Sequence, residues 1–180
     1  MALSKVDAVN FLTGTIPSGN IATSSLAAAA TGKVLQVAQT SLTSEISTTS
    51  ASYVTSGLTT TLTPSSSSNK ILILLNGGRV SYGDASTTNR MAVTFYSSIG
   101  GATAADILGS NPVTNMTMLT SDSGYTWAHS GSFLYSPSTT SSVAITPYFK
   151  AVADYGTPYF NHTSNSITPR VTLTLMEIAG

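Results

Sequence analysis

The sequence predicts an all-β protein: a single antiparallel β-sandwich of jelly-roll type that follows an extended N-terminal arm. Short stretches in which apolar and polar residues alternate recur along the chain, separated by turns rich in glycine, proline and serine. No stretch keeps the 3.6-residue helical period long enough for the crossover helices of a parallel sheet. We therefore expect an arm over residues 1–31 and a sandwich body over residues 32–180, with about eight strands.

The arm carries many apolar side chains but no regular pattern long enough for a domain of its own. Gly14, Pro17 and Gly19 interrupt any long element, and residues 26–30 suit either one helical turn or a close-packed extended strip. Its apolar side chains need a surface to cover them, which the body, a sister subunit or a larger partner could provide. The candidate anchors are Leu3, Val6, Val9, Phe11, Leu12, Ile16, Ile21 and Leu26.

Three strands are expected in the first half of the body, each bounded by turn residues. Their ranges are Lys33–Thr40, Ser52–Thr63 and Ile71–Leu75. In the first strand, strict alternation puts Leu35 and Val37 on one face, opposite Val34 and Ala38. The third strand is apolar throughout, which predicts that it is covered on both faces, by its own sandwich and by a neighbouring subunit.

Turn residues divide the rest of the body. Pro64 and the four serines after it predict a turn, and the pair Gly77–Gly78 predicts the end of a strand or a bulge. Residues 100–122 and 154–169 are expected to form loops, the first with room for a helical turn at Ala104–Leu108. The later strands are expected at Met91–Ser97, Gly124–Tyr135, Val143–Val152, in which Pro147 should mark an edge or bulge, and Arg170–Ile178.

The composition favours a role in an assembly. Only 8% of the residues are charged and the net charge is zero, whereas about 25% are charged in an ordinary soluble domain. Without long runs of charge, neither the nucleic-acid backbone nor an anionic membrane is expected as a partner. A neutral surface on which Ser and Thr replace charges gives little protection against self-association. No apolar segment is long enough for a classical signal or a membrane span, so we expect neither.

No arrangement of residues typical of catalysis or of a cofactor is present, so we predict that the protein is not an enzyme and needs no cofactor or metal. The chain has no cysteine and no GxSxG or phosphate-binding glycine loop. His129 is expected to be a packed or interface histidine, and His162 a solvated loop histidine, rather than catalytic or metal-binding residues. Asp84, Asp122 and Asp154 lie in expected loops and could converge, but an aspartate in a loop is usually a turn residue.

Aromatic residues in or beside the expected loops are the one binding signal. Their rings could stack on the face of a sugar or on a protein partner. Alternatively, they could cap the ends of the sandwich or pack against another subunit. The residues concerned are Tyr82, Tyr155, Tyr159 and Phe160.

Several stretches, taken together in this order, resemble one known group of proteins. They are Gly32–Val37, Ser52–Val54, Gly57–Leu58, Leu62–Ile73 and Thr174–Gly180, with a connector-like segment at Ile16–Ile21. In these residues the chain is similar to small β-rich virion structural proteins of tailed bacteriophages, of the capsid decoration (cement) or fibre type. The likeness is carried by residues 32–75 and 170–180.

The resemblance implies a virion component, assembled in the host cytoplasm, that forms a homotrimer and binds a major capsid protein or another virion protein. Because the arm has only about 30 residues, where fibres of this type often have a longer shaft, a capsid-surface decoration protein or short head fibre is favoured. Such a protein would stabilise the particle through its arm. The alternative is a tail-fibre module that recognises a cell-surface glycan through residues 100–122 and 154–169.

Overall fold

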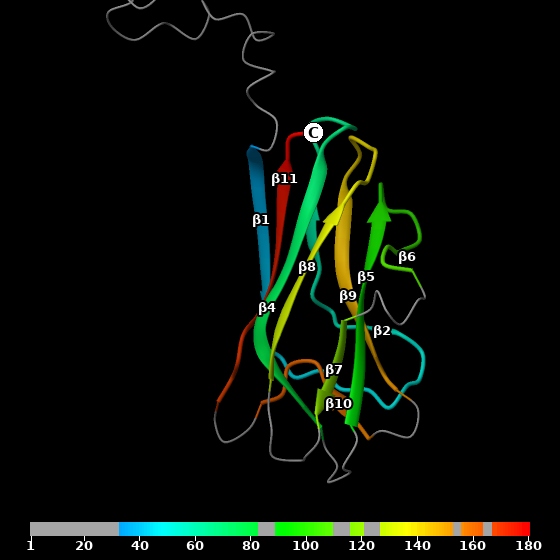
Figure 1. Cartoon of the computed structure of the whole chain (residues 1–180), viewed down its shortest axis with the longest axis vertical. Helices are drawn as coiled ribbons and strands as arrows, with labels where there is room; N and C mark the ends of the chain where they lie inside the picture. Colours follow the sequence, from blue (N-terminus) through cyan, green and yellow to red (C-terminus); the bar gives the residue numbers. More distant parts are fainter. Residues whose placement is uncertain (1–32, 83–88, 110–115, 121–126, 153–155, 164–166) are drawn as a thin grey trace, which may run out of the picture.

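The structure, a computed structural model, describes residues 33–82, 89–109, 116–120, 127–152, 156–163 and 167–180. This part of the chain is an antiparallel β-sandwich, as predicted (Figure 1). Within it, no helix has the length and apolar character needed to cross a membrane. The strands are β1 (Val34–Leu42), β2 (Val54–Thr55), β3 (Thr60–Leu62), β4 (Lys70–Tyr82), β5 (Asn89–Ile99), β6 (Ala105–Asp106), β7 (Met116–Thr120), β8 (Trp127–Tyr135), β9 (Val143–Ala151), β10 (Pro158–Tyr159) and β11 (Val171–Ile178).

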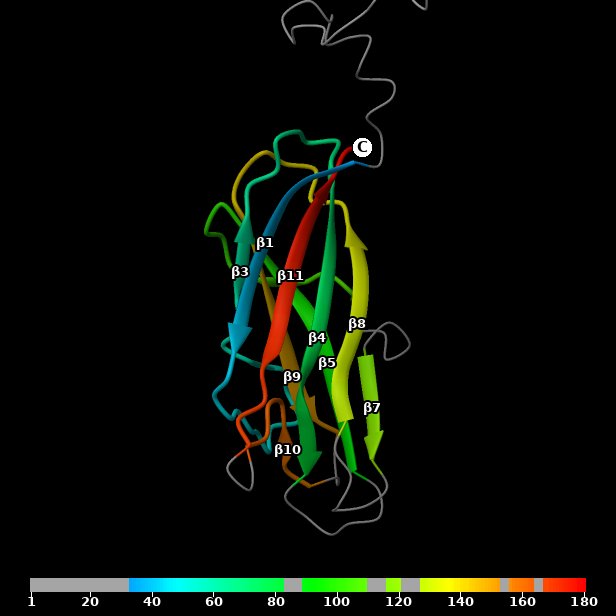
Figure 2. The same ribbon diagram turned by 90° about the vertical axis from the view of Figure 1, so that its left-hand side faces the viewer.

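Two sheets pack face to face. The first sheet has the order β1-β11-β4-β8, with β10 paired to the far end of β4. In the second sheet β9 lies between β5 and the short strands β2 and β3, and β6 and β7 pair with the other side of β5. The chain passes repeatedly from one sheet to the other, as Figure 2 shows, which is the connectivity of a jelly roll built from interleaved Greek keys. The jelly-roll prediction is therefore confirmed.

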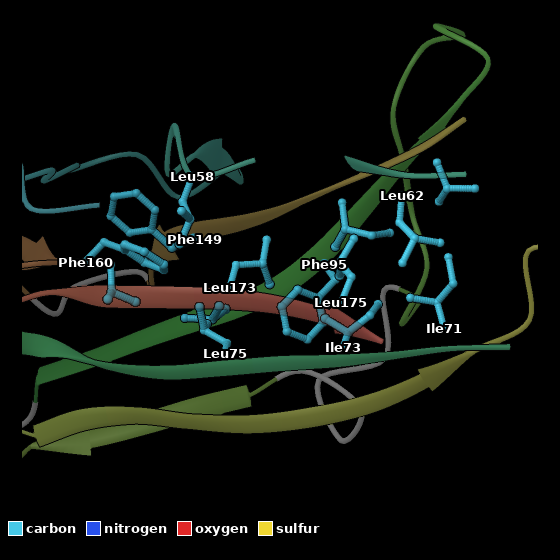
Figure 3. Close-up of a cluster of buried hydrophobic side chains, with 14 of the residues drawn as sticks. Leu58, Leu62, Ile71, Ile73, Leu75, Phe95, Phe149, Phe160, Leu173 and Leu175 are labelled. Carbon is cyan, nitrogen blue, oxygen red and sulfur yellow. The ribbon is translucent and has the colours of Figure 1, made fainter. Parts of the chain in front are cut away.

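The core lies between the sheets and follows the period-two pattern of the sequence (Figure 3). Strand β9 alternates strictly between buried and half-buried residues along its whole length. Alternate residues are buried in β5, at Met91, Val93 and Phe95, and in β11, at Val171, Leu173 and Leu175. The buried cluster consists of Leu58, Leu62, Ile71, Ile73, Leu75, Val80, Met91, Val93, Phe95, Val143, Ile145, Phe149, Phe160, Val171, Leu173 and Leu175.

The faces predicted for β1 need correction. A register shift between Val34 and Gln36 breaks the alternation, so Val34 lies opposite Ile178 and Val37 lies opposite Met176. Val34 and Val37 are therefore both on the outer face, and both are exposed. Ala38, predicted on the same face as Val34, instead points inward and packs against the core. One extra residue in a strand reverses the faces on one side of it.

The single strand predicted over Ser52–Thr63 is two strands, β2 and β3, both paired with β9. Thr55 pairs with Tyr148 of β9, and Thr60 pairs with Ile145. The chain therefore takes five steps from Thr55 to Thr60, whereas β9 takes only three between the two partners. The extra residues include Gly57, whose φ is +72°. A left-handed residue of this kind turns the chain out of the ladder and back.

This interruption also explains Pro147, which was expected at an edge or a bulge and instead lies inside the second sheet. Pro147 lies opposite Phe95 of β5. Its carbonyl accepts a hydrogen bond from the backbone N–H of Ser56 at 3.0 Å, so its backbone faces the gap between β2 and β3. The bulge is thus in the partner strand, where no regular ladder needs the N–H that proline lacks.

Gly77 and Gly78 form the bulge that was one of their two predicted roles, and β4 continues beyond them to Tyr82. Their φ angles are +79° and +70°. The N–H of Gly78 donates to the carbonyl of Arg170 at 2.7 Å. A Cβ on Gly77 would lie 2.7 Å from that same oxygen, so the close approach of β4 to the start of β11 requires glycine there.

Segments predicted as loops contain short strands. The expected helical turn at Ala104–Leu108 is wrong, because Ala105–Asp106 forms β6 and pairs with β5. The Asp106 carboxylate fixes this conformation by accepting hydrogen bonds from the Thr94 hydroxyl at 2.7 Å and the Leu108 N–H at 2.9 Å. Strands β7 and β10 lie in the other parts of the predicted loops that the structure describes.

Candidate functional site

Three of the stretches that carry the resemblance, Gly32–Val37, Leu62–Ile73 and Thr174–Gly180, meet at one end of the sandwich. The start of β1, the turn before β4 and the end of β11 lie together there (Figure 1). The N–H of Ala179 donates to the carbonyl of Lys33 at 2.9 Å, and the N–H of Gly180 donates to Asn69 Oδ1 at 3.1 Å. The first described residues and the last residues of the chain therefore lie side by side, and we call this region the terminal end of the body.

Glu177 organises the terminal end. Its side chain points inward from β11 and is 1% exposed. One carboxylate oxygen, Oε1, accepts hydrogen bonds from the N–H and the hydroxyl of Ser65, at 2.6 and 2.7 Å, and from Asn69 Nδ2 at 2.6 Å. The other, Oε2, accepts from Gln36 Nε2 at 2.6 Å, and that amide also donates to the carbonyl of Thr63. One carboxylate thus fastens the serine turn and β1 to β11.

These hydrogen bonds keep Glu177 ionised. Burial acts to raise the pKa of the carboxyl group, but donation from Asn69, Gln36 and Ser65 outweighs it and lowers the pKa to about 2. All four donors favour the charged form of the carboxyl group. The Glu177 cluster therefore acts as a structural anchor, with its carboxylate saturated by donors.

A neutral cluster fastens the loops at the opposite end, which we call the far end. The Asn161 side chain is fully buried, and its amide donates to the carbonyls of Leu42, Ser44 and Pro169 at 3.4, 3.2 and 3.1 Å. Its Oδ1 accepts from the N–H of Arg79 at 3.4 Å. No signal in the sequence predicts this role, because the partners of Asn161 come from three separate segments.

His129 is a packed histidine, as expected. It is 2% exposed, and its Nε2 lies 2.7 Å from the carbonyl of Phe160, so Nε2 carries the hydrogen. Burial lowers the pKa of His129 to about 4, although the hydrogen bond to Phe160 opposes this shift. The ring is therefore neutral at pH 7 and belongs to the far-end core, 4.3 Å from the Phe160 ring.

The predicted aromatic loop site is only partly placed. For Phe160 the structure shows the packing alternative: its side chain is fully buried and packs on Phe149, at 5.4 Å between ring centroids. Tyr159 is half-buried in β10, with its ring 4.7 Å from that of His162. Tyr82 ends β4, but its side chain and the whole of Tyr155 lie outside the described residues.

His162 is less solvated than expected of a loop histidine. Its side chain is 23% exposed, and its Nε2 lies 3.8 Å from Glu45 Oε2. The same carboxylate oxygen accepts hydrogen bonds from the N–H and hydroxyl of Thr163. Among the described residues, no group of three or more His, Cys, Asp or Glu side chains could hold a metal ion.

The remaining candidates cannot be placed. Asp84, Asp122 and Asp154 lie outside the described residues. So do all of the candidate arm anchors, namely Leu3, Val6, Val9, Phe11, Leu12, Ile16, Ile21 and Leu26.

Sequence reasoning missed a tyrosine cluster on the outer face of the second sheet. The rings of Tyr96 on β5 and Tyr148 on β9 stack at 4.0 Å, and Tyr53 lies 6.5 Å from Tyr96. The Lys150 ammonium sits 4.7 Å from the centre of the Tyr53 ring. A signal was available, because these tyrosines directly follow or precede the inward residues Phe95 and Phe149 and so must point outward.

Comparison with known proteins gives little guidance. No protein-family model and no curated protein matches the chain. A chain in the structure of infectious bursal disease virus, Gx strain, is similar over 81% of this chain and 39% of that one, with 11% sequence identity and a TM-score of 0.38. This chain therefore spans less than half of the viral chain. A likeness at that TM-score is too low to support an argument about fold or function.

Proposed function

We propose that this protein is a virion structural protein of a tailed bacteriophage, a homotrimeric decoration (cement) protein or short head fibre on the capsid surface. One observation carries the proposal. Three of the stretches that resemble such proteins are far apart in the sequence, yet Gln36, Ser65 and Glu177 from them make one hydrogen-bond cluster. A resemblance whose residues converge on one structural role is better supported than the same residues scattered over the fold.

The terminal end suits attachment of the body to a particle. The arm precedes Lys33, which lies beside the end of β11. The buried core residues that the structure describes lie between Leu58 and Leu175 and pack against one another within the body. In the proposed mechanism the arm lies across neighbouring capsid subunits and clamps them, while the body projects outward. The proposal assigns no catalysis and no cofactor to this chain.

The decisive experiment is cryo-electron microscopy of the particle that carries this protein. Density for the body at three-fold or quasi-three-fold positions of the capsid, with arms running between capsid subunits, is the expected result. Density confined to the tail would overturn the decoration role and favour a fibre. Absence of the chain from purified particles would overturn the virion role altogether.

The arm has a test of its own. Deleting residues 1–25 is expected to abolish incorporation into particles while leaving a folded body, because the body residues from Leu58 to Leu175 form a buried cluster with one another. Circular dichroism of the purified variant checks the fold, and quantitative mass spectrometry of purified particles measures incorporation. A truncated protein that still decorates particles would contradict the clamp.

A second candidate, glycan recognition, is favoured by the tyrosine cluster rather than by the loops first suggested. Stacked, partly exposed tyrosine rings on a flat sheet can bind the apolar face of a sugar. A glycan array with the wild-type protein and the Tyr148→Ala variant tests this idea. Binding that is lost in Tyr148→Ala but kept in the Tyr159→Ala control would place the site on the second sheet; a flat array would reject it.

A further inference from the structure

The outer face of the first sheet changes character along its length. Cross-strand register places one residue from each of β1, β11, β4 and β8 in a row across the sheet. The row nearest the terminal end contains only apolar residues: Val37, Met176, Leu72 and Leu134. The next contains Gln39, Thr174, Leu74 and Ser132, and the third contains only Ser41, Thr172, Asn76 and Ser130.

The first of these, which we call the apolar row, is open at both edges of the sheet. Val37 is 56% exposed and Leu134 is 49% exposed, while Met176 and Leu72 between them are half-buried. Val34 extends the same surface toward the terminal end and is 52% exposed. Single exposed apolar residues are ordinary on a protein surface, but a row that crosses four neighbouring strands of a sheet is not.

The polar rows make the contrast informative. A sheet whose outer face meets only water typically carries polar residues at every outer position, as the third row does. Strand preference alone does not explain the apolar row, because Thr and Ser occupy outer positions of the same strands two and four residues away. The apolar row is therefore a local feature that fits burial against a partner.

The charges around the row indicate what kind of partner fits. Lys70 lies next to it, at the rim, and the neighbouring row is uncharged, with Gln39, Thr174 and Ser132 around Leu74. An apolar strip with a neutral polar border has the composition of an interface core and rim. A second copy of this chain fits such a border, because only 8% of its residues are charged and its net charge is zero, so its surface offers apolar and neutral polar side chains.

We propose that the apolar row is the centre of a self-association interface, and that its occupant is a second copy of this chain. The inference rests on the homotrimer in the proposed function and gives that assembly a surface. Copies that meet through the apolar row would have their terminal ends adjacent, since the row lies beside Lys33 and Gly180. Their arms would then leave the assembly from one place.

The first test measures self-association of the full-length chain by sedimentation equilibrium. Val37→Asp combined with Leu134→Asp places two carboxylates on exposed edge positions, which the isolated fold tolerates but an apolar interface does not. The expected result is a dissociation constant at least tenfold higher than that of the wild type. The control is Ile167→Asp, a change at an equally exposed apolar residue away from the row, which should leave the constant unchanged.

The second test needs no loss of stability and separates the possible occupants. Because the chain has no cysteine, Leu134→Cys introduces a single thiol into the row. Its rate of labelling by a maleimide should fall at least fivefold as the protein concentration rises through the dissociation constant, whereas Ile167→Cys should label at a constant rate. Protection that does not vary with concentration in a monomeric protein would assign the row to the chain's own arm and overturn the proposal.

The two proposals can fail separately. A wild-type protein that associates, but whose association is unaffected by the aspartate pair, would leave the oligomer standing and overturn this interface. A wild-type protein that is monomeric at all concentrations, with Leu134→Cys freely labelled, would overturn the interface as well. The virion role would still be decided by the location of the chain in the particle.

Discussion

At each end of the sandwich one buried side chain holds several segments together by hydrogen bonds, but the two side chains differ in charge. At the terminal end a carboxylate, Glu177, accepts four hydrogen bonds of 2.6 to 2.7 Å. At the far end a neutral amide, Asn161, makes four of 3.1 to 3.4 Å. Charge-assisted hydrogen bonds are shorter and about twice as strong as neutral ones. The end from which the arm departs is thus the more firmly fastened of the two.

Removing the charge from Glu177 should have the largest effect. Glu177→Gln keeps the shape of the side chain but turns an amide N–H₂ toward donors that need an acceptor. We expect the free energy of unfolding to fall by about 3 kcal/mol, measured by urea denaturation at pH 7. Glu45→Gln is the matched control, and because Glu45 lies at the surface it should change stability by less than about 0.5 kcal/mol. Equal effects of the two changes would contradict the anchor.

Removing the amide of Asn161 should lower the free energy of unfolding by less than Glu177→Gln does. Asn161→Ala leaves the carbonyls of Leu42, Ser44 and Pro169 without this donor, and we expect a loss of about 2 kcal/mol in the same assay. Asn76→Ala, at an exposed position on the outer face, is the control and should be neutral. A larger loss for Asn161→Ala than for Glu177→Gln would reverse the order of the two ends.

Lowering the pH should remove the stabilising contribution of the far end before that of the terminal end. His129 has a pKa of about 4 in the folded protein and an ordinary value of 6.5, so the unfolded chain binds a proton that the folded chain does not between these values. Stability should therefore fall as pH drops from 6.5 toward 4, by about 1 kcal/mol at pH 5.5. The pKa of Glu177 is lowered to about 2, so its contribution is kept down to about pH 4.5 and lost below that.

Urea denaturation between pH 7 and pH 4.5 measures the histidine effect by itself. In the His129→Phe variant the dependence over that window should flatten, whatever the absolute stability of the variant. If the slope of the wild type persists in His129→Phe, another group is responsible for it.

The regular parts of this fold could be predicted because they depend on local pattern. The alternation in Val143–Ala151 and Val171–Ile178 records which face of each strand is buried, and it needs no knowledge of the partner strand. The prediction failed where one extra residue changes the parity, as in β1, or where a partner strand is interrupted, as opposite Pro147. Such events depend on the neighbouring strand.

The candidate site was harder to predict because its contacts are long-range. The donors to Glu177 lie between 108 and 141 residues away in the sequence. One clue was available. Glu177 follows the inward residues Leu173 and Leu175 at steps of two, so its side chain also points inward, and a buried charge must be paired. The role of Phe160 was left open because a ring beside a loop and a ring beneath a loop have the same neighbours in sequence.

The position of Lys33 beside Gly180 has a mechanical consequence. Strands β1 and β11 are antiparallel neighbours whose outer ends coincide, so a force pulling those ends apart would open the ladder one pair at a time, beginning at Ala179. A force that pulls on Lys33 while the rest of the body is held at the far end would instead load every pair of the ladder at once. The same strand pair would then yield readily to peeling and resist sliding.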